Sequence, residues 1–91
     1  MKFRIQFDPA KARQNLAKHK VRLADAEAAL YDPSALTLED NDHDEQRWVT
    51  VGDDGSGQIL VAVYTYRDPN FIRLISVRKA EPQEINQYRG Q

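Results

Sequence analysis

Two segments of this 91-residue sequence concentrate side chains that bind phosphate or move protons. Residues 7–19 place two lysines, an asparagine and a histidine at helical spacing, namely Lys11, Asn15, Lys18 and His19. Residues 72–79 add three cations to an apolar stretch, namely Arg73, Arg78 and Lys79. Cations attract the phosphates of a polyanion, and histidine exchanges protons near neutral pH. The two segments predict a surface that binds a polyanion and could cleave it.

The first segment reads as one side of a helix. At 100° per residue, Lys11, Asn15, Lys18 and Arg22 lie within about 60° of one another, and His19 borders them. Such a stripe is either a solvated helix face or a phosphate-binding surface. The amide favours the second interpretation, because it can hydrogen-bond a phosphate oxygen or fix a neighbouring loop. His19 could act as general acid or base, or could cap the helix end.

The second segment carries arginines that an apolar strand would not otherwise contain. Because side chains alternate along a strand, Arg73 and Arg78 have opposite parity and need not share a face. An arginine in such a strand must pair with an acid or face a wet cleft. The acids available for pairing on neighbouring strands are Glu39, Asp40 and Glu45. The alternative is a phosphate, which the guanidinium fork fits well, and Arg47 admits the same two readings.

The remaining candidates are aromatic or lie in a loop. Trp48, Tyr64 and Tyr66 fall in predicted strands, where aromatic side chains either pack in the core or stack on bases. His43 lies in an acidic turn and is expected to be structural or merely exposed. The chain has no cysteine and two histidines, so it predicts no disulfide, no structural zinc and no cofactor.

These residue types permit RNA cleavage without a metal ion. The 2′-hydroxyl of RNA is an internal nucleophile, so neither a serine or cysteine nor a metal ligand is needed. A base takes the 2′-hydroxyl proton, an acid protonates the 5′-oxygen, and arginine and lysine stabilise the charge that grows on phosphorus. We therefore expect metal-independent endoribonuclease chemistry if the cations converge.

The charge distribution supports a polyanion as the ligand. The net charge of −1 conceals seven Lys or Arg against one acid in residues 1–22, and seven acids against one arginine in residues 39–54. Local potential determines which partner a surface attracts. The length fits one domain over residues 1–91, and no apolar run is long enough for a signal peptide or a membrane span. We expect a soluble cytoplasmic protein.

The pattern of apolar residues predicts an α+β fold in the order β-α-α-β-β-β-β-α. Strands are expected over 2–7, 35–39, 47–52, 58–67 and 71–79, with helices over 9–19 and 23–31 and a last helix after residue 80. Short turns between the later strands predict an antiparallel sheet, with the helix hairpin and the C-terminal helix packed on it. Strand 58–67 is apolar on both faces, so the second face needs a cover from the C-terminal helix or a partner.

Several short strings resemble those of the BrnT family of type II toxin–antitoxin toxins, small ribonucleases with a RelE-like fold. The strings are Phe7-Asp8-Pro9-x-Lys11-x-x-x-Asn15-x-x-Lys18-His19, Leu36-Thr37-Leu38-Glu39-Asp40, Arg47-Trp48-Val49-x-Val51-Gly52, Leu60-Val61-x-Val63-Tyr64 and Ile72-Arg73-Leu74-Ile75-Ser76-x-Arg78-Lys79-Ala80, followed by Glu84 and Tyr88. The resemblance implies an RNA-cleaving growth inhibitor that blocks translation. It also implies a BrnA-like antitoxin with a ribbon-helix-helix domain, through which alone the complex reaches operator DNA.

The site residues follow from both lines of reasoning. We assign catalysis to Lys18, His19, Arg47, Arg73 and Arg78. We assign RNA binding to Lys11, Asn15, Tyr64 and Lys79.

One position departs from the family pattern. The family usually carries glycine after the lysine–histidine pair, whereas this chain carries Lys20. A left-handed residue at a helix end favours glycine, and lysine there costs about 1 kcal/mol unless the helix end differs. The alternative function is therefore a degenerate toxin that binds the antitoxin and acts as an operon co-repressor without cleaving RNA.

Overall fold

The computed structural model describes residues 4–41 and 46–91. Its elements follow the predicted order: β1 Arg4–Gln6, α1 Pro9–His19, the 3₁₀ turn η1 Leu23–Asp25, α2 Ala26–Leu30, β2 Leu36–Asp40, β3 Arg47–Asp53, β4 Ile59–Asp68, β5 Phe71–Lys79 and α3 Pro82–Arg89. The second predicted helix is thus split into a 3₁₀ turn and a short α-helix. The start of the first predicted strand, His43 and Glu45 lie outside the described residues.

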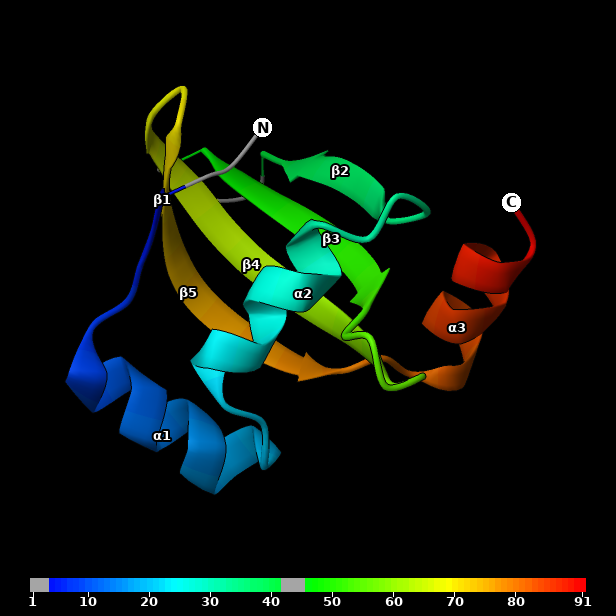
Figure 1. The fold of residues 1–91 in the computed structure, drawn as a ribbon, viewed down its shortest axis with the longest axis horizontal. Helices are drawn as coiled ribbons and strands as arrows, with labels where there is room; N and C mark the ends of the chain where they lie inside the picture. The colour runs from blue at the N-terminus through cyan, green and yellow to red at the C-terminus, as the bar shows by residue number, and fades with distance from the viewer. Residues whose placement is uncertain (1–3, 42–45) are drawn as a thin grey trace.

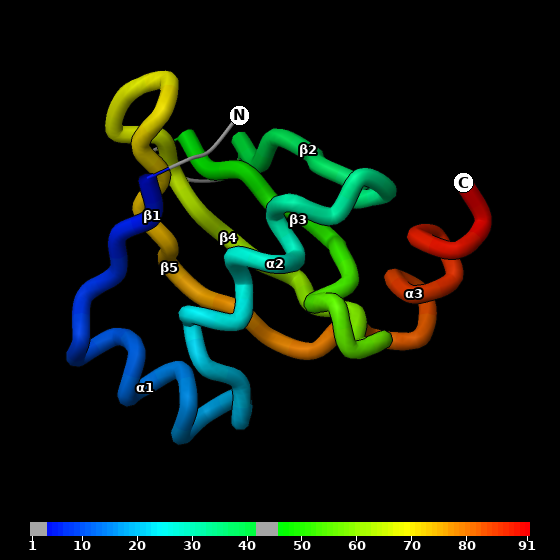
Figure 2. Tube along the Cα trace, viewed as in Figure 1, coloured from blue at the N-terminus to red at the C-terminus, as the bar shows by residue number. Residues whose placement is uncertain are grey.

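The five strands form one sheet in the order β1-β5-β4-β3-β2 (Figure 1). Strands β2 to β5 form the predicted antiparallel meander, because their short connections allow only hairpins. Strand β1 differs, since it pairs with β5 in parallel and makes the sheet mixed. Figure 2 shows the reason: the chain leaves β1 through both helices before it enters the meander, so no hairpin constrains its direction.

The helical segments α1, η1 and α2 pack on one side of the sheet. Helix α1 lies beside β5, and α2 crosses β3 and β4 (Figure 1). At the crossing, a Cβ atom on Gly52 would lie 2.3 Å from the backbone oxygen of Ala29, so only glycine permits this approach. The core lies in this layer and includes Leu23, Leu60, Ile72, Leu74 and Val77.

A β-bulge in β5 places both arginines on the face opposite α2. Val63 of β4 pairs with Ser76, whereas the next residue, Tyr64, pairs with Leu74, so Ile75 is an extra residue. The bulge resets the alternation of side chains. Arg73 and Arg78 therefore share a face despite their opposite parity, because they pair with Thr65 and Val61 of one strand face. Parity alone could not have predicted this.

Helix α3 is attached mainly by polar contacts and has no buried residue. Arg78 donates two hydrogen bonds of 2.8 Å to the carboxylate of Glu84. At the other end of the helix, the Tyr88 hydroxyl donates to Asp32, which also accepts from the backbone N–H groups of Ser34 and Asp53. Figure 1 shows α3 to one side of the sheet, not across its open face. No helix of the described residues is long and apolar enough to span a membrane.

Candidate nucleic-acid cleft

Local sequence determines both ends of the helix that carries the first candidates. The Asp8 carboxylate caps α1 by accepting a 2.8 Å hydrogen bond from the N–H of Ala10, and Pro9 occupies the first turn, as predicted. At the other end Lys20 takes the left-handed conformation, with φ of 61°, and its N–H bonds to Leu16. The helix end therefore keeps a left-handed cap although glycine is missing, and His19 is the last residue of α1.

Two adjoining hollows bring most of the predicted residues together. The first has a volume of about 210 Å³ and lies between α1 and the bulge of β5; its lining is Lys11, Gln14, Asn15, Lys18, His19, Ile75 and Ser76. The second, of about 90 Å³, is lined by Lys11, Arg47, Thr65, Arg73 and Ile75. Because Lys11 and Ile75 line both, we treat the two hollows as one cationic cleft. Six of the predicted residues line it, namely Lys11, Asn15, Lys18, His19, Arg47 and Arg73.

The arginines in this cleft have unused hydrogen-bonding capacity. The Nε atom of Arg47 is buried and has no hydrogen-bond partner among the described residues. Within the described part of the chain, Arg73 forms no ion pair, and the pairing with Glu39 predicted for the strand arginines does not occur, since Glu39 accepts from Gln46. A buried N–H without a partner is costly. Because the Arg47 Nε is buried, Arg73 is the arginine that offers an anion in the cleft a guanidinium with no ion pair to a described residue.

Arg78 lies on the same face as Arg73 but lines neither hollow. Its guanidinium is paired with Glu84, a partner that neither predicted reading included. The hydrogen bonds to this carboxylate raise the pKa of Arg78, and the same bonds hold the pKa of Glu84 below its ordinary value. The catalytic role assigned to Arg78 would require Glu84 to release it.

Three of the four residues assigned to RNA binding do not present a free group to the cleft. Asn15 is buried, and its amide donates both hydrogens within the protein, to the carbonyls of Val21 and Val77. Of the two roles predicted for this amide, binding a phosphate oxygen and fixing a neighbouring loop, the structure shows the second. Lys79 is exposed but lines neither hollow.

Tyr64 takes the core-packing alternative and not the exposed position that base stacking needs. Its side chain is 3% exposed and packs in the core on the helix-covered face. Burial raises the pKa of the phenol, and the hydroxyl is hydrogen-bonded to that of Thr50 at 2.8 Å. Tyr64 packs among apolar neighbours because β4 presents this residue to the side of the sheet that α2 covers. Of the four RNA-binding assignments, Lys11 and Asn15 line the cleft, and the amide of Asn15 is engaged within the protein.

Sequence reasoning missed other lining residues. Thr65 shares the open face with Arg73, and its position follows from the alternation along β4 once the face of Tyr64 is known. Ile75 reaches both hollows only because it is the bulge residue, and no signal in the sequence marks that bulge.

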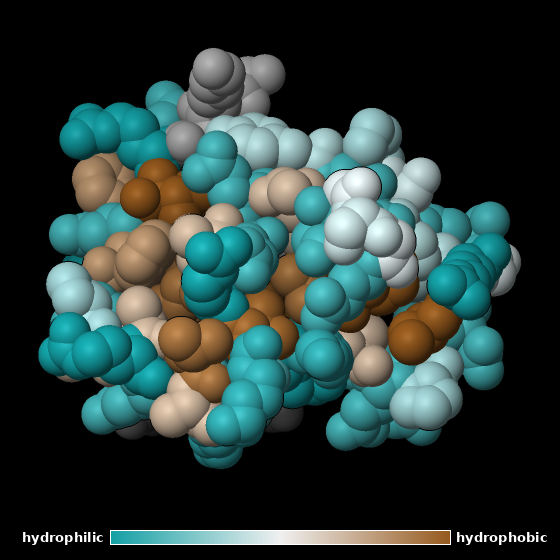
Figure 3. All heavy atoms as spheres, turned by 60° about the horizontal axis from the view of Figure 1, so that its bottom comes forward, coloured by the Kyte–Doolittle hydropathy of each residue, from teal (hydrophilic) through white to brown (hydrophobic). Residues whose placement is uncertain are grey.

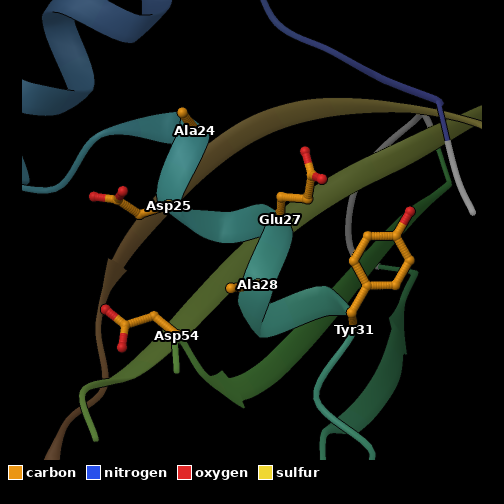
Figure 4. A pocket seen from close by; sticks show the side chains of 6 residues that line it. All are labelled: Ala24, Asp25, Glu27, Ala28, Tyr31 and Asp54. Atoms are coloured by element: carbon orange, nitrogen blue, oxygen red, sulfur yellow. The ribbon is translucent and has the colours of Figure 1, made fainter. Parts of the chain in front are cut away.

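A larger hollow of about 320 Å³ lies on the side of α2 and is acidic. Figure 4 shows its carboxylates, from Asp25, Glu27 and Asp54, pointing in different directions around the space. Among the described residues, no group of three or more His, Cys, Asp or Glu side chains is placed to hold a metal ion. A negative hollow repels phosphate, so the cationic cleft is the candidate for nucleic acid.

Comparison with known proteins agrees with the sequence resemblance. Residues 7–84 match the family model described as the ribonuclease toxin BrnT of type II toxin–antitoxin systems. The fold matches the crystal structure of the ribonuclease toxin BrnT of Brucella abortus with a TM-score of 0.70 and 24% identity, covering 88% of this chain and 99% of that one. No curated protein matches the sequence. The family match covers most of the chain, and the chain therefore belongs to the BrnT family of ribonuclease toxins.

Proposed function

We propose that this toxin cleaves RNA in the cationic cleft by a metal-independent attack of the 2′-hydroxyl on the adjacent phosphorus. The observation that carries the proposal is the convergence of Lys11, Lys18, His19, Arg47 and Arg73 from three elements on one cleft. The guanidinium of Arg73 supports it, since it lines the cleft and forms no ion pair with a described residue, and a phosphate would accept its hydrogen bonds.

The residues divide into two chemical roles. Arg47 and Arg73 would bind the phosphate and stabilise the charge of the phosphorane, which is usually the larger contribution to catalysis. His19 and Lys18 lie in the last turn of α1 and would exchange protons with the 2′- and 5′-oxygens. The 2′-oxygen forms a bond to phosphorus, the bond from phosphorus to the 5′-oxygen breaks, and the products are a 2′,3′-cyclic phosphate and a 5′-hydroxyl.

A type II toxin has an antitoxin partner, and we propose a BrnA-like protein with a ribbon-helix-helix domain. Free toxin would degrade RNA and stop translation, and the complex would reach operator DNA only through the antitoxin. The alternative of a degenerate, non-cleaving binding module was motivated by Lys20. Lys20 takes the left-handed conformation that the family's glycine would favour, so the helix end supplies no reason to prefer this alternative.

The test compares the wild-type chain with Arg73→Ala and with the double variant His19→Ala, Arg73→Ala. We expect wild-type protein to arrest growth when expressed alone and to cleave RNA in excess EDTA, leaving 5′-hydroxyl ends. Each variant should lose about 100-fold or more in cleavage rate. Arg67→Ala, an exposed arginine that lines neither hollow, is the matched control. Loss of cleavage on adding EDTA, or undiminished cleavage by the double variant, would refute the mechanism.

A further inference from the structure

Helix α1 carries a second candidate binding surface on the side that faces away from the cationic cleft. There α1 and η1 enclose a groove of about 260 Å³ whose floor is formed by Phe7, Ala12, Leu16 and Leu23. Figure 3 brings this end of the molecule forward and shows hydrophobic surface surrounded by hydrophilic groups. The groove shares no lining residue with the cleft.

The groove leaves apolar surface in water that a partner could bury. Leu16 is 46% exposed, although its neighbour across the groove, Leu23, is 1% exposed and belongs to the core. An apolar partner side chain inserted there would remove the exposed area of Leu16 from water, together with its own, which favours association. The groove is too small for a whole helix or strand, so it fits one or two large side chains that project from a partner.

The charged residues at the groove are both arginines. Arg13 forms no ion pair with any described residue, and Arg22 is 71% exposed, with a single 3.2 Å contact to the partly exposed Asp25. Lys20 lies two residues before Arg22 and is also exposed. This rim selects an acidic segment and disfavours a basic one, because like charges repel across an interface.

We infer that this groove is a docking site for the antitoxin, which inserts a large apolar side chain flanked by acidic residues. The inference rests on the proposed function, in that the occupant is the neutralising antitoxin. It has one structural consequence: the antitoxin holds α1 from the side opposite to Lys11 and Lys18. Residues of the groove would then contribute to antitoxin affinity and contribute nothing to RNA cleavage.

The test measures the affinity of the purified chain for its antitoxin, taken as the protein whose co-expression abolishes growth arrest. Leu16→Glu places a charge against the inserted apolar side chain, and Arg13→Glu places an acid against the partner's flanking acid. Each should weaken binding about thirtyfold or more, while RNA cleavage by the free chain stays within twofold of wild type. A lysine substituted for the facing acid of the antitoxin should restore binding to Arg13→Glu.

Matched controls lie far from the groove. Leu38→Glu changes a leucine that is 72% exposed on β2, and Arg67→Glu reverses an exposed arginine on β4. Both should bind the antitoxin like wild type, and circular dichroism should show all four variants folded. Unchanged affinity in the groove variants would overturn the inference. So would a loss of RNA cleavage in Arg13→Glu, which makes the groove a nucleic-acid site, or a change only in the self-association of the free chain.

The two proposals fail separately. If wild-type chain cleaves RNA but the groove variants bind antitoxin normally, the docking site is wrong and the nuclease stands. If the groove variants lose the antitoxin but the wild-type chain does not cleave RNA, the docking site stands and the nuclease is wrong.

Discussion

Asn15 in α1 forms two hydrogen bonds with the backbone of Val77 in β5, 62 residues later in the chain. Its Nδ2 donates to the Val77 carbonyl at 2.8 Å, and its Oδ1 accepts from the Val77 N–H at 3.0 Å. Strand β1 pairs with β5 only along residues 71–73, so the amide takes the place of a neighbouring strand beyond its end. This contact fixes the helix that carries the cleft lysines against the strand that carries Arg73.

Replacing Asn15 with leucine should destabilise the protein strongly. Leucine has a similar volume but leaves three buried backbone groups without partners, the carbonyl of Val21 and both groups of Val77. At about 1–3 kcal/mol for each unsatisfied group, the free energy of unfolding should fall by about 3 kcal/mol or more. Urea unfolding followed by Trp48 fluorescence measures it. Gln14→Leu, an exposed neighbour, is the control and should change stability by at most about 0.5 kcal/mol.

The sequence predicted the elements well because local rules determine them. The Asp8-Pro9 pair begins α1 where capping chemistry says it should, and runs of β-branched, apolar and aromatic residues between turn-forming segments located the strands of the meander. The parallel pairing of β1 was not predictable, since no hairpin sets its direction. The cleft was predictable only in part. Lys11 and Arg73 lie far apart in the sequence, and only the fold shows that they line one cleft. The bulge at Ile75 determines which face of the sheet Arg78 occupies.

Side-chain partners were the weakest part of the prediction, for a physical reason. Arg78 was predicted to pair either with an acid of a neighbouring strand or with a phosphate. In the structure it pairs with Glu84, because α3 brings this glutamate next to β5. The same glutamate completes a capping box with Glu81 at the start of α3. Sequence periodicity locates that helix but not the angle at which it folds back, and this angle selects the ion pair.

Lys20→Gly should stabilise the protein. Lys20 has φ of 61°, a region in which a Cβ atom is strained and glycine is not. Removing that strain should raise the free energy of unfolding by about 1 kcal/mol. Ala17→Gly, at an exposed position inside the same helix, should lower it by a similar amount, about 1 kcal/mol. Chemical denaturation measures the change in the free energy of unfolding for both variants. A Lys20→Gly protein that is less stable than wild type would contradict the left-handed cap.

The contact between Arg78 and Glu84 should make stability sensitive to acid. The hydrogen bonds from Arg78 hold the pKa of the Glu84 carboxyl below its ordinary value of 4.5, so the folded state gives up this proton more readily than the unfolded chain. The stabilisation of the folded state by this ion pair is therefore complete above about pH 4.5. It is lost as the pH falls through the lowered pKa of Glu84 in the folded state. Because Arg78 is partly exposed, solvent screens the pair, and we expect about 1 kcal/mol at neutral pH.

Glu84→Gln tests this contact. The variant should be less stable than wild type at pH 7 by that amount, and the difference should disappear in acid, where both side chains are neutral. Unfolding curves recorded at several pH values measure it. Glu27→Gln, an exposed glutamate on α2, should show no such pH-dependent difference. A constant difference across the pH range would mean that the glutamine disturbs packing and that the ion pair contributes little.

Arg47→Met should raise the stability of the protein and weaken its binding to RNA. Methionine keeps the apolar stem of the side chain and removes a buried Nε–H that has no partner in the described part of the chain. Since an unsatisfied buried donor costs about 1–3 kcal/mol, the variant should unfold at a higher temperature than wild type. Its affinity for single-stranded RNA should fall, and the salt dependence of binding should weaken by about one phosphate contact. Thermal unfolding and fluorescence anisotropy at two salt concentrations measure both effects. Arg67→Met, at an exposed site outside the cleft, should change neither the unfolding temperature nor the binding of RNA. If Arg47→Met is less stable than wild type and still binds RNA fully, Arg47 stabilises the fold and does not bind phosphate.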